Sequence, residues 1–250
     1  MKRLIINLSV IVVSVAIIAV MHSIAQTDEL VQTETASSEY PLIIIDAGHG
    51  GQDGGAVARD GTQEQYINLD IALKLDAVLN ECGFDTLLTR SDDNSIHDSD
   101  KTTIREQKVS DIHNRLKIIE EHPGCIFISI HQNYYTESKY SGTQVFYSPN
   151  NPESKVLAQY IQESVVSSLQ PDNTRQVKES GDSIYILYYA AEIAVLVECG
   201  FLSNDEETAK LNDDNYRAEM AESICAGLVN YLSSETETTE NESGTVFNMK

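Results

Sequence analysis

Three short apolar runs, separated by helix-like stretches, constrain the fold of this chain more than any other feature. The runs Pro41–Ile45, Cys125–Ile130 and Ile193–Val197 are rich in branched side chains and contain no charged residue. Uninterrupted runs of this kind are typical of strands that are buried on both faces of a sheet. Because amphipathic helical patterns lie between them, the sequence predicts an α/β fold, a single domain with a mostly parallel or mixed sheet covered by helices on both faces.

The other elements follow from residue spacing and turn residues. Apolar residues three to four positions apart predict helices over about 62–82, 103–121, 151–169 and 215–232. Thr62 and Gln65 have the spacing of a capping box at the start of the first helix. Further strands are expected over the remaining patterned segments, 84–90 and 144–148, whereas 184–188 fits either a strand or a loop.

The charge balance excludes one class of partner. The chain of 250 residues has 39 acidic and 17 basic residues, a formal net charge of −22. Nucleic-acid binding needs clustered Lys and Arg, and the sequence has no basic run beyond Lys2-Arg3. We therefore expect no nucleic-acid partner, and we interpret the acidic excess as a determinant of solubility.

The N-terminus has the features of an export segment. Lys2 and Arg3 precede the apolar run Leu4–Val20, and Ser23 and Ala25 fit the −3 and −1 positions of a cleavage site. The run of 17 residues is slightly long for a signal-peptide core of ~7–15 residues and short for a spanning helix of ~17–25. Residues 1–26 are thus either a cleaved signal peptide or a retained membrane anchor. Both alternatives place the remainder outside the cytoplasm and limit membrane contact to this segment.

Acidic, Ser/Thr-rich segments flank the predicted domain. Residues 27–40 are expected to be a flexible linker, 41–232 the folded domain, and 233–250 a disordered tail. The four cysteines are widely spaced and form no C-x-x-C motif, which argues against a sulfur-based zinc cluster. Export permits disulfides, but the apolar surroundings of three of the cysteines favour buried thiols.

Polar, ionisable residues follow all three apolar runs. His49 lies in the glycine-rich turn after the first run, His131 directly follows the second, and Glu198 directly follows the third. Sites in open α/β sheets form beyond the carboxyl ends of the strands, so we expect these side chains to meet at one edge. Glu64, fifteen residues after His49, lies in the first turn of the next helix and is expected to join them.

The residue types at this edge indicate metal chemistry. Two imidazoles and one carboxylate suit a catalytic Zn²⁺ with an open fourth position, and a second carboxylate remains for proton transfer. Each residue has a structural alternative, such as a strand-end hydrogen bond for His131, a helix-dipole interaction for Glu64 or simple solvation for Glu198. The glycine run lacks the Lys-Ser/Thr of a P-loop and the spacing of a dinucleotide loop.

The same residues stand within longer motifs that resemble a known family. The motifs are IIDAGHGGQDGGA at 44–56, Glu64 with Asn68-Leu69, Thr89-Arg90, SIHQN at 129–133 and VECGFLSN at 197–204. In this order they resemble the zinc-dependent N-acetylmuramoyl-L-alanine amidases of the type 3 catalytic domain, over about residues 41–232. One departure is Ala47, where the family usually has Pro, a change in loop stiffness and not in a ligand.

This resemblance implies a specific chemistry. His49, Glu64 and His131 would bind one zinc ion, and Glu198 would be the catalytic carboxylate. The reaction would be hydrolysis of the amide bond between N-acetylmuramic acid and L-alanine in peptidoglycan, in remodelling of the cell wall or spore cortex. Two alternatives remain open: a non-catalytic peptidoglycan-binding module, and a zinc peptidase acting on wall peptides.

The resemblance also bears on partners and location. An N-terminal anchor followed by a bare catalytic domain is most similar to the spore-cortex, germination-related amidases. Some of those enzymes depend on a second protein, so we expect an exported activator in addition to the peptidoglycan substrate. The enzyme would then be secreted or membrane-anchored at the cell wall.

Overall fold

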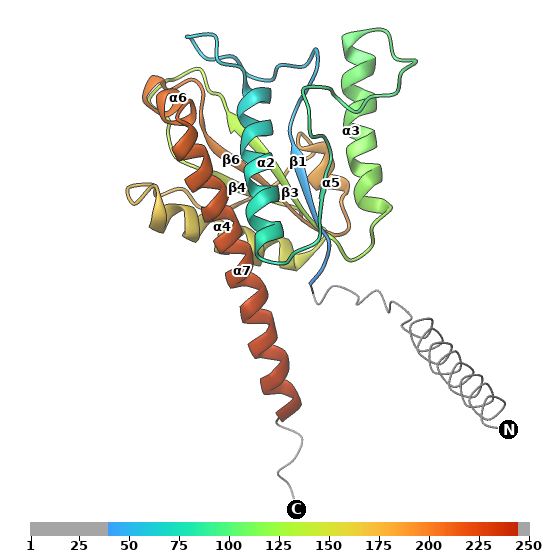
Figure 1. The fold of residues 1–250 in the computed structure, drawn as a ribbon, viewed down its shortest axis with the longest axis vertical. Coiled ribbons are helices and arrows are strands. Elements are labelled where there is room, and N and C mark those ends of the chain that lie inside the picture. Colours follow the sequence, from blue (N-terminus) through green and yellow to red (C-terminus); the bar gives the residue numbers. More distant parts are fainter. Residues whose placement is uncertain (1–39, 245–250) are drawn as a thin grey trace, which may run out of the picture. The chain divides into compact units, whose positions relative to one another are not determined.

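A computed structural model describes residues 40–244 of the chain, and side chains as far as residue 234 (Figure 1). The expected export segment (1–26), nearly all of the expected linker (27–40) and the last six residues of the expected tail lie outside the described residues. Within the described part, no helix has both the length and the apolar character needed to cross a membrane.

The described residues form one mixed sheet of six strands in the order β2-β1-β3-β6-β4-β5. The strands are β1 (Ile43–Ala47), β2 (Thr86–Leu88), β3 (Ile126–Asn133), β4 (Gln144–Tyr147), β5 (Lys178–Glu179) and β6 (Ile193–Phe201). Strands β2, β1, β3 and β6 run parallel to one another, whereas β4 runs antiparallel to β6. The three apolar runs of the sequence become the adjacent strands β1, β3 and β6, and the expected α/β fold is confirmed.

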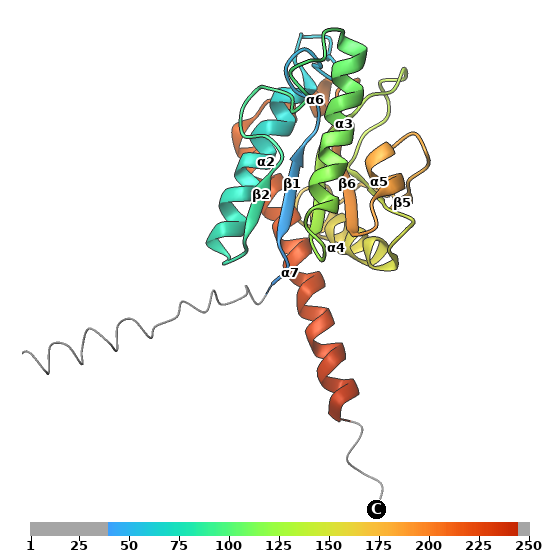
Figure 2. The same cartoon turned by 90° about the vertical axis from the view of Figure 1, so that its right-hand side faces the viewer.

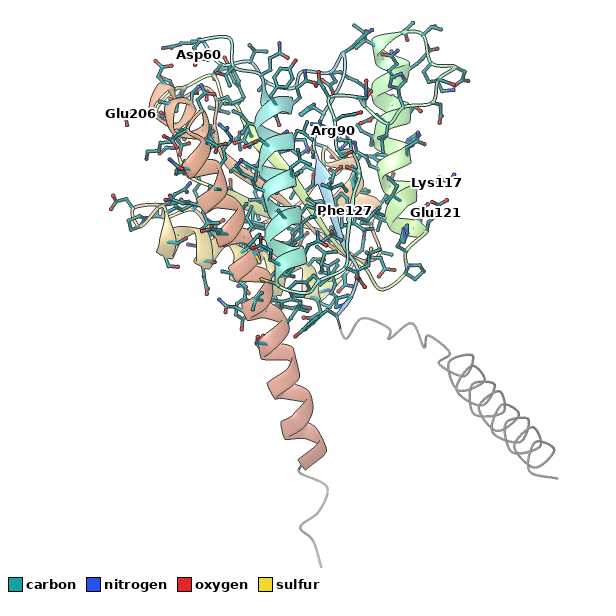
Figure 3. The ribbon with its side chains drawn as sticks, viewed as in Figure 1. Asp60, Arg90, Lys117, Glu121, Phe127 and Glu206 are labelled. Atoms are coloured by element: carbon teal, nitrogen blue, oxygen red, sulfur yellow. The ribbon has the colours of Figure 1, made fainter. Side chains whose placement is uncertain are left out.

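Helices cover both faces of the sheet (Figures 1 and 2). One face packs against α2 (Glu64–Glu81), α4 (Pro152–Ser168) and α7 (Asp214–Gly244), and the other packs against α3 (Ile104–Glu120) and α5 (Tyr185–Tyr189). A short helix, α6 (Asp205–Leu211), follows β6. Phe127 of β3 is fully buried on the α3 side, and Lys117 and Glu121 lie on the outer side of that helix (Figure 3).

Some predicted elements differ in the structure. The segment 184–188, expected to be a strand or a loop, lies largely in the helix α5. It does not add a strand to the edge of the sheet, because Leu187 packs onto the face formed by β3 and β6. The capping box is absent: α2 begins after Gln63, and the Gln65 side chain donates to the Gln63 side chain at 3.0 Å. Helix α6 and strand β5 were not predicted from the sequence.

The C-terminal helix is longer than predicted. Helix α7 continues to Gly244, whereas the apolar pattern ends near residue 232 and a disordered tail was expected from 233. The expectation is therefore wrong for residues 233–244, whose Glu- and Thr-rich sequence has no apolar spacing from which a helix could be predicted.

The cysteines are free thiols, as expected. Cys125, Cys199 and Cys225 are buried, whereas Cys82, which caps the C-terminus of α2, is exposed. The Sγ atoms of Cys82 and Cys225 lie 3.9 Å apart.

Both core clusters are built from residues after Tyr40, so the described part should fold without the segment that precedes it. We predict that a chain beginning at residue 40 gives a soluble domain with one cooperative thermal transition. Aggregation of that chain, or a transition without cooperativity, would show that the N-terminal segment contributes to the core.

Candidate active site and metal centre

Strand alternation and register bring two of the predicted site residues together. On β3 the side chains of Phe127, Ser129 and His131 face α3 and α5, because successive residues of a strand point to opposite faces. In the parallel pair of β3 and β6, His131 is the register partner of Glu198. Both residues lie inside their strands, which extend further than the apolar runs that predicted them.

The loop after β1 positions His49 in an unusual backbone conformation. His49 has φ of 63°, in the left-handed region that non-glycine residues rarely adopt. Two buried arginines hold this loop by its carbonyl oxygens. Arg115 donates to the carbonyls of Ala47 and His49, each at 2.8 Å, and Arg90 donates to those of Ala47 and Gly48 at 2.9 and 3.0 Å.

A buried ion pair anchors one of these arginines, Arg115, to the sheet. Asp46 lies in β1 on the side that faces α3, is completely buried and pairs with Arg115. It also accepts hydrogen bonds from Thr89 at 2.7 Å and Ser129 at 2.6 Å. Burial would raise the pKa of Asp46, but the Arg115 charge and these hydrogen bonds outweigh it and hold the pKa below its usual value. Asp46 is therefore a carboxylate.

The structure gathers His49, Glu64 and His131 into one cluster. Each can offer one ligand atom, and the three atoms lie within 4.8 Å of one another. Glu64 stands between the two imidazoles: its Oε2 is 3.2 Å from His49 Nε2 and its Oε1 is 2.9 Å from His131 Nδ1. The cluster joins the β1–α2 loop, the start of α2 and the end of β3.

Backbone amides fix the Glu64 carboxylate. Ala56 N donates to Oε2 at 2.8 Å and Gln132 N donates to Oε1 at 3.0 Å. Burial would raise the pKa of Glu64, but hydrogen bonds with His131 and His49 outweigh it and keep the pKa well below its usual value. Glu64 is thus an anionic group, oriented before any ligand arrives.

Glycine at position 48 gives His131 its space. A Cβ at Gly48 would lie 2.2 Å from His131 Nε2, closer than any real Cβ contact. At Gly55, with φ of 67°, a Cβ would lie 2.5 Å from Glu64 Oε2. The glycine-rich turn therefore passes over the cluster as bare backbone.

Glu198 faces the same site from β6. It lines a cavity of about 270 Å³ together with His49, His131 and apolar residues of β3, α3 and α5. Its Oε2 is buried and has no hydrogen-bond partner among the described residues. Burial raises the pKa of Glu198 to about 7, although the His131 charge opposes the shift. The cavity therefore holds a carboxyl group that can exchange a proton near neutral pH.

Two contributors were not predicted from the sequence. Asp53 accepts from His49 Nδ1 at 3.0 Å and pairs with Lys108 of α3 at 2.7 Å. Arg115 acts on the His49 loop from α3, 66 residues away in the chain. For Asp53 the sequence offered one signal, its spacing of four residues from His49. For Arg115 it offered none, because contacts between distant elements become visible only in the fold.

The cluster has the donors that a catalytic metal site requires. Two imidazoles and a carboxylate match the ligand sets of zinc enzymes that keep an open position. A histidine ligand typically places its second nitrogen against a carboxylate, as His49 does with Asp53. Glycine at positions 48 and 55 lets the backbone pass close to the His131 ring and the Glu64 carboxylate without a side chain filling the site. The residues present therefore fit a metal ion.

The mixed sheet, the His-Glu-His cluster at its carboxyl edge and the adjoining cavity define an α/β enzyme with a candidate metal centre. The sequence profile described as N-acetylmuramoyl-L-alanine amidase matches residues 43–230, and the chain belongs to this family. The expected enzyme class, an amidase acting on peptidoglycan, is confirmed, and its site of action is outside the cytoplasm.

Individual relatives agree with this assignment. The chain is 32% identical over 191 residues to the germination-specific N-acetylmuramoyl-L-alanine amidase of Bacillus subtilis, covering 76% of this chain and 79% of that protein. It is 40% identical to the CwlD amidase of Clostridioides difficile, solved in complex with the GerS lipoprotein, with a TM-score of 0.75 and coverage of 78% and 100%. A second Clostridium difficile amidase is 27% identical with a TM-score of 0.68, covering 79% and 99% of the two chains.

We predict that Arg115→Met destabilises the metal-free domain by about 3–5 kcal/mol, because it leaves Asp46 buried without its counter-charge. Arg59→Met is the matched control. The side chains of Arg59 and its ion-pair partner Asp205 are 73% and 68% exposed, so this pair should contribute less than about 1 kcal/mol to the free energy of unfolding. Denaturant unfolding with chelator present measures both. Equal losses from the two variants would contradict the role given to the buried pair.

Proposed function

We propose that this amidase is zinc-dependent, with His49, Glu64 and His131 as the ligands of one ion and Glu198 as the catalytic carboxylate. The observation that carries the proposal is the fixed Glu64 carboxylate between two imidazoles. Glu198, on the strand next to that of His131, faces the cavity that both imidazoles line. A zinc ion held by these residues would lower the pKa of a water from 15.7 towards ~7 and would polarise the scissile carbonyl.

Residues of the chain carry out the proton transfers and hold the ligands in position. Glu198 accepts a proton from the attacking water through its unpartnered Oε2 and passes that proton to the leaving amine of L-alanine. Burial raises the pKa of this carboxyl to about 7 in the metal-free domain, and a bound cation would lower it and favour the carboxylate that the first transfer needs. Asp53 holds the His49 ring by Nδ1, and Arg115 holds the His49 backbone.

The proposed reaction is tested by digesting purified peptidoglycan with and without a zinc chelator and identifying the released end groups by mass. We expect new L-alanine amino termini and free lactyl carboxyl groups, which disappear with chelator and return with added zinc. Shortened stem peptides would identify a wall peptidase instead, and no product would identify a binding module.

We predict that His131→Ala abolishes tight zinc binding and leaves the fold intact, because the sheet core does not include this side chain. His122→Ala is the control, since His122 bonds to the Ile118 carbonyl at the end of α3, outside the cluster. Metal analysis after dialysis measures zinc in both variants. Full occupancy in His131→Ala would remove His131 from the ligand set.

Glu198→Gln should retain zinc and lose about 10²–10⁴-fold in turnover, because an amide of nearly the same shape cannot accept the proton. Glu206→Gln, an exposed change in the first turn of α6, should match the parent enzyme. Single-turnover rates on muropeptides measure both. A rate above about a tenth of the parent value in Glu198→Gln would exclude Glu198 as the base.

We also propose that the enzyme acts in spore-cortex remodelling during germination and has a protein activator. Two relatives support this: the amidase named germination-specific in Bacillus subtilis, and the CwlD amidase solved with the GerS lipoprotein. The proposed zinc ligands come from three separate segments, so a docked protein that keeps these segments together would raise zinc affinity. Full turnover by the purified chain on cortex peptidoglycan at micromolar zinc, unchanged by extract from the producing cell, would exclude an activator.

The N-terminal segment is proposed to deliver the enzyme to the wall, either as a cleaved signal or as a retained anchor. The support is the charged start followed by the apolar run Leu4–Val20. N-terminal sequencing of the exported protein separates the two: a chain beginning after residue 25 or 26 indicates cleavage, and Met1 or Lys2 indicates an anchor.

A further inference from the structure

Helix α5 carries three tyrosines that form a continuous aromatic surface beginning in the catalytic cavity. We call Tyr185, Tyr188 and Tyr189 the tyrosine strip. Tyr185 lines the cavity beside Glu198. Its ring lies 4.6 Å from the Tyr189 ring, which lies 5.1 Å from that of Tyr188. The outer two are exposed, at 41% for Tyr188 and 55% for Tyr189.

The strip is held rigidly to the domain. Between its tyrosines, Leu187 is fully buried against the sheet. Asn150 donates to the Tyr188 carbonyl at 2.8 Å, and the His113 ring of α3 lies 5.1 Å from the Tyr185 ring. Figure 2 shows α5 next to α3 on the same side of the sheet. A rigid aromatic surface binds a ligand with little loss of side-chain entropy.

The chemistry of the strip fits a neutral ligand. Helix α5 has the sequence YILYY, with no charged residue, in a chain with a net charge of −22. Tyrosine presents an apolar ring face and a hydroxyl at its edge. A ligand with alternating apolar faces and hydroxyl groups matches this surface, as the sugar rings of a glycan do.

The size of the cavity shows why such a surface is needed. Its volume of about 270 Å³ lies below the ~300–1,000 Å³ of ordinary ligand pockets, so it can hold the scissile amide and its neighbours but not a polymer. The substrate amide is attached to a sugar of a glycan strand. The strand must therefore cross the surface around the cavity, and the tyrosine strip forms the part of that surface that adjoins Tyr185.

We propose that the tyrosine strip is a binding site for sugar rings of the peptidoglycan glycan strand. The inference rests on the proposed function and deepens it, since it assigns the polymer of the same substrate to a surface outside the metal cluster. A protein docked on this strip would cover a wall of the cavity and hinder entry of the strand, which favours the glycan as occupant.

The test compares the double variant Tyr188→Ala/Tyr189→Ala with Tyr66→Ala, which removes a tyrosine of similar exposure, 51%, from α2. The probe is glycan strand from which the stem peptides have been removed, and calorimetry measures its binding. We expect about a tenfold loss of affinity in the double variant, because the sugar rings would cover these two aromatic rings on binding, and no loss in Tyr66→Ala.

Kinetics with two substrates separate binding from structural damage. On polymeric peptidoglycan the double variant should show a raised KM and an unchanged kcat, whereas kcat/KM on an N-acetylmuramoyl peptide with a single sugar should match the parent enzyme. Equal losses on both substrates, or unchanged glycan affinity, would overturn the proposal. Loss of activation by a lipoprotein with normal glycan binding would also overturn it and identify the strip as a protein interface.

The proposed function fails by a different result. If the parent enzyme releases no L-alanine amino termini from peptidoglycan, the amide hydrolysis is wrong whatever the strip binds. If the parent enzyme releases them and the double variant binds glycan normally, only the role of the strip is wrong.

Discussion

The ion pair between Asp46 and Arg115 is the interaction on which the site depends. Both side chains are buried, and a buried charge is strongly unfavourable unless its partner and hydrogen bonds remain in place. Because Arg115 also bonds to the carbonyls of Ala47 and His49, the end of β1, helix α3 and the His49 loop form one unit. The left-handed backbone of His49 is kept in place by this unit.

The site also depends on two carboxyl groups whose pKa values shift in opposite directions. Hydrogen bonds with two imidazoles and two backbone amides keep Glu64 ionised, as a metal ligand must be. Burial without such partners raises the pKa of Glu198. Separation of this kind lets one carboxyl hold a fixed charge while the other exchanges protons. The two environments arise because Glu64 lies under a glycine-rich turn and Glu198 faces an apolar cavity.

The features that could be predicted from the sequence are those that depend on a single segment of the chain. Apolar runs identified β1, β3 and β6, and the residues at their ends placed His49, His131 and Glu198 at one edge. The sequence could not predict Arg115 or α5, because their roles arise from contacts between elements far apart in the chain. Helix α6 could have been found: Asn204 caps it through the amides of Glu206 and Glu207, and three acidic residues occupy its first turn.

The register of β3 on β6 limits which sequence changes this protein can tolerate in these two strands. His131 and Glu198 are paired across neighbouring strands, so the separation of their backbones is fixed by the sheet at about 4.8 Å. Replacing a neighbouring apolar residue perturbs that spacing only slightly. A single residue inserted or deleted ahead of this pair in either strand turns one of the two side chains to the opposite face of the sheet, whereas the register already shifts directly after His131. Variation among natural relatives in these two strands should therefore consist of exchanges of residues at constant strand length, with changes in length confined to the loops.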